Sequence, residues 1–456
     1  MNRYDRQLRL WGSEGQKLIS ESHICLVGPE TMLLQECFKN LALLGTSKFS
    51  WVRSNTDGPR EDLFYSDLDT ELSPLNPAGV EISKFWLVDS SKKLHECQFW
   101  AQFSVIMIVS EHRVSSAILH SMEQSRVPVI PLFSSGVCGY VYIRTTEPHL
   151  IIDTHPDYQV PLLHLGNPWP ELSQFLSKFK LMYTSALNCA QLPYVVLLYN
   201  ALQRMKMEDL DVTTKNVRET LEKWYLGEDN PDGAFDLNYD EAVRFAHLCS
   251  VTDADTKTRL CKLARELRPV NFTNSYNRDI STMISALDDY VAIYFSVMVT
   301  PGLPDMESSN AIYRALESVY LAKARSDGQN YRRILDEKSS YAQMDPSRVD
   351  NFCQNFRNVD RMHPSVTTLA DFFDGAIDCS YDAGLLDILK WQVGNNLHPT
   401  KLERDLNIPA SYPTASFIAG LACQEAVKLI THQYTPVHNV TVYNSNSASP
   451  TTNITI

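Results

Sequence analysis

Short apolar runs alternate with helical periodicity over the first third of the chain. Residues 24–27 predict a buried strand, and residues 30–43 predict a helix, because apolar side chains recur on one face at i, i+4 and i+7. Gly45 suits the C-terminal cap of that helix. The same patterns predict a helix over 115–125 and further strands at 49–52, 85–88, 103–109 and 127–132. This alternation is typical of a Rossmann-like α/β fold, with a parallel sheet covered by helices on both faces.

The alternation of strand and helix patterns stops after residue 165 and resumes near residue 400. The strand patterns at 137–144 and 150–153 are expected to extend the sheet, and the Pro-rich passage 155–170 is expected to end this part. The following stretch, up to 394, is mostly helical, most clearly at 218–225, 240–250, 256–266 and 308–324. Pro413 then opens a strong helix over 415–431, and strand patterns follow at 437–443 and 453–456. The expected domains are the first part of the sheet, a helical insertion and the completion of the sheet, at 1–165, 166–400 and 401–456.

Bulk composition narrows the classes of partner. Acidic residues outnumber basic ones by 54 to 41, which gives a formal charge of −13, and no basic cluster stands out. Nucleic acid is not an expected partner, because binding to phosphates needs clustered Lys and Arg. The longest apolar stretch, 290–299, has about half of the ~20 residues that a membrane helix needs. A buried helix is expected there, and no membrane partner.

Cysteine and histidine spacing gives no metal-site pattern. The ten cysteines contain no CxxC pair and the twelve histidines no HxxxH or HxH pair, so no metal site is expected. The first residues form no apolar secretory segment. The cytoplasm or the nucleus, both reducing compartments, is the expected location.

The turn after the first predicted strand is where a nucleotide-binding sheet presents its glycines. Only Gly28 remains of a Gly-x-Gly-x-x-Gly pattern, Pro29 removes a donor, and Glu30 would repel a phosphate at the positive end of the next helix. The second strand should end in an acidic residue that holds the ribose, but Arg53 follows Val52. We expect a degenerate nucleotide site with no cofactor bound by this chain, in which Gly28 keeps a tight turn and Arg53 forms a salt bridge. A different α/β fold, unrelated to nucleotide-binding proteins, would also fit this turn.

Several segments carry a family resemblance. The opening Tyr-Asp-Arg-Gln-Leu-Arg-Leu-Trp-Gly, residues 4–12, and the phrase at 39–45 resemble the ubiquitin-activating enzyme family with its bacterial ThiF/MoeB-type relatives. Three further segments resemble the regulatory subunits of the Nedd/Rub activating enzymes, in the right order along the chain. They lie at 147–172, 303–324 and 424–430.

The resemblance implies a pseudo-adenylation fold that pairs with a catalytic subunit in a heterodimer. The partner would hold ATP and Mg, carry the catalytic cysteine and recruit the Nedd/Rub-type modifier. This chain would then be no enzyme on its own. Arg6 lies where the family reaches across the dimer to the partner's ATP phosphates, which suits a guanidinium. The interface candidates are Tyr4, Arg6, Gln7, Arg9 and Trp11, of which Arg9 is expected in an ion pair and Trp11 as a packing anchor.

Missing motifs agree with a non-catalytic role. Active members carry an Asn-x-x-Arg-Gln-Phe segment after the second strand, which residues 57–65 lack, and an Asp after a later strand, where Ser110 and Glu111 follow Val109. The family's catalytic cysteine is typically followed by Thr, and none of the ten cysteines here is. Cys249 and Cys261 lie in the insertion and are expected to be idle thiols.

Four alternative functions remain open at this point. The chain could be the equivalent subunit for a SUMO-type modifier, whose insertion is expected to be shorter. It could be an adaptor with no role in activation. A self-sufficient adenylating enzyme and a dinucleotide oxidoreductase are both disfavoured by the broken glycine turn and by Arg53.

Overall fold

The computed structural model divides the chain into two compact units. The sheet unit comprises Met1–His155, Phe272–Arg278 and Asn358–Ile456, and the helical unit comprises Pro156–Asn271 and Asp279–Arg357. These boundaries lie at 155/156 and 357/358, where the sequence suggested 165/166 and 400/401. The described residues are 3–53, 68–88, 91–109, 114–179, 191–225, 237–338, 344–374, 411–445 and 451–455.

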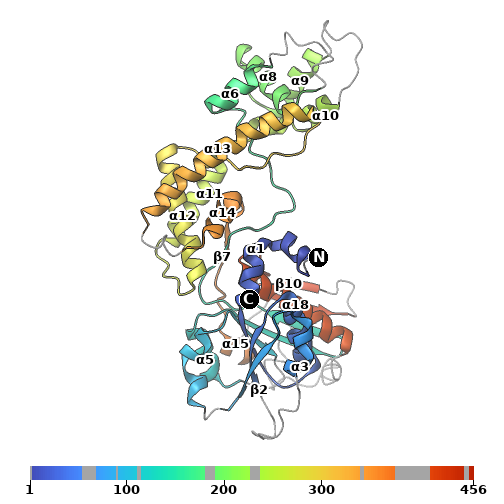
Figure 1. Ribbon diagram of the computed structural model, residues 1–456, viewed down its shortest axis with the longest axis vertical. Helices are drawn as coiled ribbons and strands as arrows, with labels where there is room; N and C mark the ends of the chain where they lie inside the picture. Colours follow the sequence, from blue (N-terminus) through green and yellow to red (C-terminus); the bar gives the residue numbers. More distant parts are fainter. Residues whose placement is uncertain are drawn as a thin grey trace. The chain divides into compact units, whose positions relative to one another are not determined.

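An eight-stranded sheet forms the centre of the sheet unit (Figure 1). Its strand order is β10-β9-β6-β5-β4-β1-β2-β3, and the five strands from β5 to β3 run parallel. The remaining three, β6, β9 and β10, are antiparallel. This confirms the predicted α/β class and adds an antiparallel extension. The strands are β1 His23–Val27, β2 Lys48–Arg53, β3 Glu81–Trp86, β4 Val105–Val109, β5 Val129–Ser135, β6 Cys138–Tyr142, β9 Val440–Asn444 and β10 Thr451–Ile454.

Helices cover both faces of this sheet, and the strand alternation decides which side chains each layer meets. Ile24 and Leu26 of β1 point to one face and share a core cluster with side chains of α1, α2 and α18. Cys25 and Val27 point to the other face and pack with α4, α5 and α15. The helices of the first layer are α1 Asp5–Glu21, α2 Met32–Leu44, α3 Leu68–Leu72 and α18 Tyr412–Thr431. Those of the second are α4 Cys97–Ala101, α5 Ser116–Gln124 and α15 Leu369–Asp374, with short 3₁₀ turns at Ser73–Leu75 and Lys92–His95.

Local capping explains the ends of the two central helices. Thr31 caps α2, because its hydroxyl accepts from the Leu34 amide at 3.3 Å, and Gly45 follows its last residue as predicted. Ser411 caps α18 in the same way through the Thr414 amide, and Pro413 lies in the first turn, where a missing N–H costs nothing.

Two expected strands are placed differently by the structure. The strand predicted at 85–88 is β3, Glu81–Trp86, which begins four residues earlier than the apolar run suggested. The strand predicted at 150–153 does not extend the main sheet. It is β7, His149–Ile151, and it pairs with β8, Asp360–Met362, in a separate two-stranded sheet. Because β8 lies more than 200 residues later, no local pattern reveals this pairing.

The described residues of the helical unit form helices joined by loops, with no strand among them. Its core surrounds α8 and includes the buried side chains of Leu316 and Tyr320. The Tyr320 hydroxyl donates to the Leu163 carbonyl at 2.7 Å, and the Tyr331 hydroxyl donates to the Met283 carbonyl at 2.9 Å. The helices are α6 Pro170–Ser177, α8 Tyr194–Met207, α9 Thr214–Tyr225, α10 Leu237–Arg244, α11 Ala254–Leu267, α12 Ser275–Tyr294, α13 Asn310–Asp336 and α14 Pro346–Asn355, with 3₁₀ turns at Ala246–Ser250 and Phe356–Asn358. The first residues of α12, up to Arg278, and Asn358 belong to the sheet unit.

The apolar stretch 290–299 is not the buried helix that the sequence suggested. Helix α12 ends at Tyr294, and Ile293 and Phe295 are 57% and 80% exposed. In this stretch, Tyr290 within the helix and Val297–Val299 beyond it are buried. Apolar content alone did not distinguish a helix end on the surface from a buried segment. Within the described residues, no helix has the length and apolarity to cross a bilayer.

Candidate functional site

Gly28 lies at the point of the sheet where an α/β fold places its ligand. The chain runs from β1 to β2 and β3 on one side and from β4 to β5 on the other, so β1 and β4 are neighbours at the switch in strand order. Open α/β sheets bind ligands in the crevice at the carboxyl ends of such strands. Gly28 follows β1 directly, and Val109 ends β4 beside it.

The Gly28 turn is closed against its neighbours. A Cβ atom on Gly28 would lie 2.3 Å from the Val109 carbonyl oxygen, and the φ of 147° is one that other residues rarely adopt. The Gly28 amide donates to the Val52 carbonyl at 3.0 Å. Its own carbonyl accepts from the buried indole N–H of Trp51, also at 3.0 Å. The glycine thus serves a close backbone approach, and its N–H is already used inside the protein.

The two charges that break the nucleotide pattern are paired with each other. The Arg53 guanidinium lies 3.3 Å from a carboxylate oxygen of Glu30, and their side chains are only 13% and 25% exposed. Arg53 also lies over the rings of Trp51 and Trp86, with 5.2 and 5.6 Å to the centroids. The sequence suggested a salt bridge for Arg53 but did not reveal its partner. The opposite charges at the ends of the turn and of β2 are the signal that could have found it.

These residues do not fit a nucleotide. Phosphate binding at a helix N-terminus needs free backbone N–H groups and no competing anion. Here the Gly28 amide is used, Pro29 has none, and the Glu30 carboxylate stands at the start of α2. The ribose position at the end of β2 carries Arg53, already bonded to Glu30. Residues 57–65 and 110–111, where further family motifs were sought, lie outside the described residues.

The N-terminal interface candidates lie on the first part of α1. Arg6 is exposed, and among the described residues no partner forms an ion pair or hydrogen bond with its side chain. Arg9 forms an exposed ion pair with Asp5 at 3.0 Å, one helical turn away. Tyr4 is partly buried, and burial raises the pKa of its hydroxyl. Among the described residues at this end, Arg6 therefore presents an uncommitted charge.

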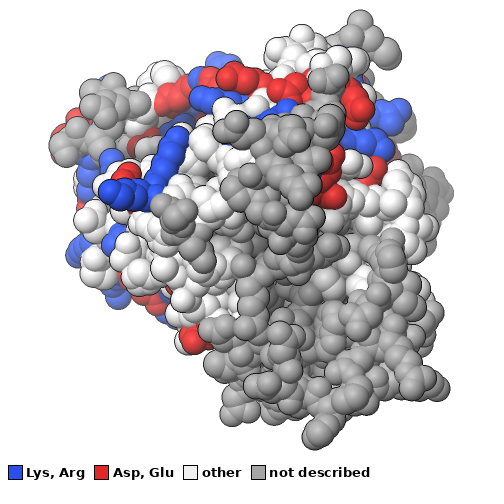
Figure 2. Space-filling view, turned by 90° about the horizontal axis from the view of Figure 1, so that it is seen from below, with Lys and Arg blue, Asp and Glu red and all other residues white. Residues whose placement is uncertain are grey.

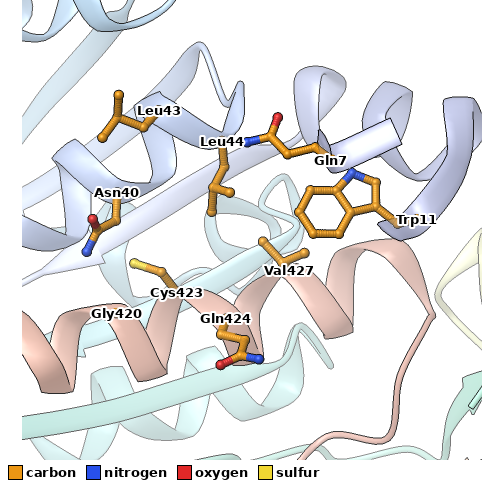
Figure 3. A pocket seen from close by; sticks show the side chains of 9 residues that line it. All are labelled: Gln7, Trp11, Asn40, Leu43, Leu44, Gly420, Cys423, Gln424 and Val427. Carbon is orange, nitrogen blue, oxygen red and sulfur yellow. The ribbon is translucent and has the colours of Figure 1, made fainter. Parts of the chain in front are cut away.

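Gln7 and Trp11 line a groove between α1, α2 and α18 (Figure 3). The Trp11 indole N–H donates to Gln16 at 3.1 Å, and the Gln16 amide in turn donates to the Leu44 carbonyl at 2.9 Å. The groove has a volume of ≈ 320 Å³. Sequence reasoning did not reveal this groove. It is lined by Gln7, Trp11, Asn40, Leu43, Leu44, Gly420, Cys423, Gln424 and Val427.

The outer side of α18 continues the groove. The helix is rich in apolar residues, and most of its length is buried, which is typical of a helix that is largely covered. Yet Phe417 is 42% exposed, Gly420 and Leu421 are half-buried, and Gln424 is exposed. These residues recur at i, i+3, i+4 and i+7 and so form one stripe. On α1, Leu10 is 49% exposed as well.

Cys249 and Cys261, two of the cysteines in the insertion, have the properties of idle thiols. Burial raises the pKa of Cys249 to about 12. Burial and a hydrogen bond to Asp288 raise the pKa of Cys261 to about 11. Both thiols are therefore protonated near neutral pH, whereas a nucleophilic cysteine needs its thiolate.

Charge on the described surface is mixed. On the face in Figure 2, acidic and basic side chains lie interspersed, and the described part of this face carries no broad basic patch. No cluster of three or more His, Cys, Asp or Glu with metal-site geometry occurs among the residues that the structure describes.

Comparison with known proteins identifies the family. No family model matches the chain. It is 32% identical to the "NEDD8-activating enzyme E1 regulatory subunit" of Saccharomyces cerevisiae over 99% of both chains. It is 23% identical to the subunit of the same name from Danio rerio, over 99% of this chain and 98% of that one. It is 24% identical to the "NEDD8-activating enzyme E1 regulatory subunit AXR1" of Arabidopsis thaliana, over 97% and 94%. Glu30 and Arg53 close the Gly28 turn, and the chain resembles these proteins over nearly its full length. The chain therefore belongs to the family of NEDD8-activating enzyme E1 regulatory subunits.

Proposed function

We propose that this chain is the non-catalytic half of a heterodimer that activates a NEDD8-type modifier. ATP and Mg would bind to the catalytic partner, which would form the modifier adenylate and then the thioester on its own cysteine. The observation that carries the proposal is the Glu30–Arg53 ion pair across the Gly28 turn. It places a carboxylate where a phosphate would bind and a paired cation where a ribose carboxylate would be needed.

Arg6 would act in trans on the partner's ATP phosphates. It lies near the start of α1, exposed and without a side-chain partner among the described residues, whereas the nearby Arg9 is paired with Asp5. A guanidinium remains charged at all physiological pH values and offers several donors to phosphate oxygens. It would offset the negative charge that develops as the modifier's C-terminal carboxylate attacks the α-phosphate.

The groove and the α18 stripe would form part of the surface that binds the catalytic subunit. Exposed apolar residues on one side of a helix that is otherwise buried favour contact with a protein partner over contact with solvent. Two features support this surface: the half-buried Leu421 between exposed Phe417 and Gln424, and exposed Leu10 on the neighbouring helix. We expect Phe417→Asp to weaken the heterodimer, beyond the small loss of stability that follows when its ring contact with Tyr443, at 4.4 Å between centroids, is removed.

Reconstitution with the catalytic subunit tests the proposal. ATP–pyrophosphate exchange should require both chains and a NEDD8-type modifier, and a SUMO-type modifier should not replace it. Arg6→Ala should slow the exchange by about 10²-fold, the usual effect of removing one preorganised donor from a charged transition state. Arg3→Ala is the matched control, because the Arg3 guanidinium already donates to the Leu75 carbonyl at 2.6 Å. Exchange by this chain alone would refute the proposal, and an unchanged rate for Arg6→Ala would remove the role in trans.

A further inference from the structure

The helix that carries Arg6 is broken in its middle. Within α1, Gly12 has φ 70° and ψ −178°, so the helix consists of an arm, residues 5–11, and a second part that continues to Glu21. This backbone region is essentially restricted to glycine. No atom lies within 4 Å of the position that a Cβ on Gly12 would take, so the glycine is required by the backbone direction and not by close packing.

Two side chains from one short segment hold the last turn of the arm. The Gln433 side-chain amide donates to the Trp11 carbonyl at 2.9 Å, and the Tyr434 hydroxyl donates to the Leu10 carbonyl at 3.3 Å. Carbonyls in the last turn of a helix in general lack an amide partner within the helix and need one from elsewhere. Gln433 and Tyr434 follow α18 directly and are more than 400 residues away in the sequence.

The segment that supplies these two side chains has an unusual backbone. His432 and Tyr434 have φ values of 55° and 60°, in the left-handed region that side chains other than Gly and Asn seldom adopt. Strained conformations of this kind persist where the surrounding structure requires them, often near functional sites. Here the segment is tied down by the Tyr434 amide, which donates to the Asp153 carbonyl at 2.8 Å, and by His155, which stacks on the Tyr434 ring at 4.1 Å.

The second part of α1 is fixed separately to the sheet unit. The buried Glu14 carboxylate accepts from the Tyr276 hydroxyl at 3.2 Å, and Gln16 joins the end of α2 through the Leu44 carbonyl. With this part fixed and Gly12 set as the bend, the contacts from Gln433 and Tyr434 act together with the Trp11–Gln16 hydrogen bond to hold the arm in its direction. The arm carries Arg6 on its first turn.

We propose that Gln433 and Tyr434 are positioning residues that hold the 5–11 arm in the direction that presents Arg6 to the partner's nucleotide. This positioning role rests on the proposed function, because that function gives Arg6 its target, the partner's ATP phosphates. Neither residue touches a reacting group. Each acts through the end of the arm, which it fastens to the segment after α18.

Hydrogen–deuterium exchange of the full chain tests the holding of the arm, independently of activity. In Gln433→Ala, the amides of the arm should exchange about 5-fold faster, the effect of losing one hydrogen bond of ordinary strength, and Tyr434→Phe should act in the same direction. Amides in the second part of α1 should keep their rates. Gln102→Ala is the matched control, because the Gln102 amide donates to the Phe99 carbonyl at 2.7 Å at the end of α4. Unchanged exchange in the arm of both Gln433→Ala and Tyr434→Phe overturns the proposal.

ATP–pyrophosphate exchange by the reconstituted heterodimer tests whether the arm acts through Arg6. Gln433→Ala should slow ATP–pyrophosphate exchange in the wild-type background. In the Arg6→Ala background it should cause no further decrease in that rate. A loss in both backgrounds overturns the proposal, because Gln433 would then act by another route. If Arg6→Ala alone leaves the rate unchanged, the role of the arginine in trans fails and the positioning role fails with it, while the amide exchange still reports on the holding of the arm.

Discussion

Replacing Arg53 by alanine is expected to destabilise the sheet unit by about 2–4 kcal/mol. The ion pair with Glu30 lies between the exposed and buried extremes, with side chains 13% and 25% exposed, and contributes about 1–2 kcal/mol. The contacts of the guanidinium with the Trp51 and Trp86 rings contribute about 0.5–1 kcal/mol each. Truncation also leaves the Glu30 carboxylate without this cation at the start of α2.

Urea unfolding followed by tryptophan fluorescence measures this change, because Trp51 and Trp100 are fully buried in the sheet unit. Arg53→Lys should lose about 1 kcal/mol, since it keeps the charge but not the planar stacking. The control is Arg9→Ala, whose pair with Asp5 is 78% and 52% exposed and should matter by less than about 0.5 kcal/mol. A loss below about 0.5 kcal/mol for Arg53→Ala would refute the reasoning that this pair holds the turn closed.

Three further outcomes follow from the structure. Gly28→Ala should cost more than about 3 kcal/mol, because its Cβ would lie 2.3 Å from the Val109 carbonyl oxygen, and a wild-type melting temperature would contradict this. The thiols of Cys249 and Cys261, with pKa values of about 12 and 11, should not react with iodoacetamide in the folded protein at pH 7.5; rapid alkylation, located by mass spectrometry, would contradict the assignment as idle thiols. Burial lowers the pKa of His149 well below its ordinary value, so only the unfolded chain gains this proton as the pH falls through about 6.5. Stability should therefore decline below that pH by up to about 1.4 kcal/mol per unit, and less steeply in His149→Phe; identical slopes in urea unfolding at several pH values would show that His149 does not contribute.

The sequence predicted those features that depend on local periodicity and single residues. The strand at 24–27, the helix after it and the Pro413 helix all appear within one to three residues of the expected bounds. The degenerate turn could be recognised because Gly28, Pro29 and Arg53 each depart from the nucleotide pattern by themselves. Family resemblance added the regulatory branch, which the comparisons support over nearly the whole chain.

Features that depend on contacts between distant parts of the chain could not be read from the sequence. The pairing of β7 with β8 joins residues about 210 positions apart, and the groove forms only when α18 packs beside α1 and α2. Gly12 and Ser13 are residue types typical of turns, but the sequence alone could not show that the helix bends there or in which direction the arm points. The exposed end of α12 at Ile293 and Phe295 was missed because hydrophobicity indicates burial only when a neighbouring element is there to cover it.

Binding of Mg-ATP to the isolated chain is the most direct measurement. Equilibrium dialysis against radiolabelled ATP at millimolar magnesium should detect no saturable site, because the Gly28 N–H is used, Glu30 stands at the start of α2 and Arg53 is paired with it. Arg53→Ala should bind no better, since the Glu30 carboxylate remains. One tightly held nucleotide per chain, lost on Gly28 substitution, would contradict the account that this sheet supports catalysis only through a partner.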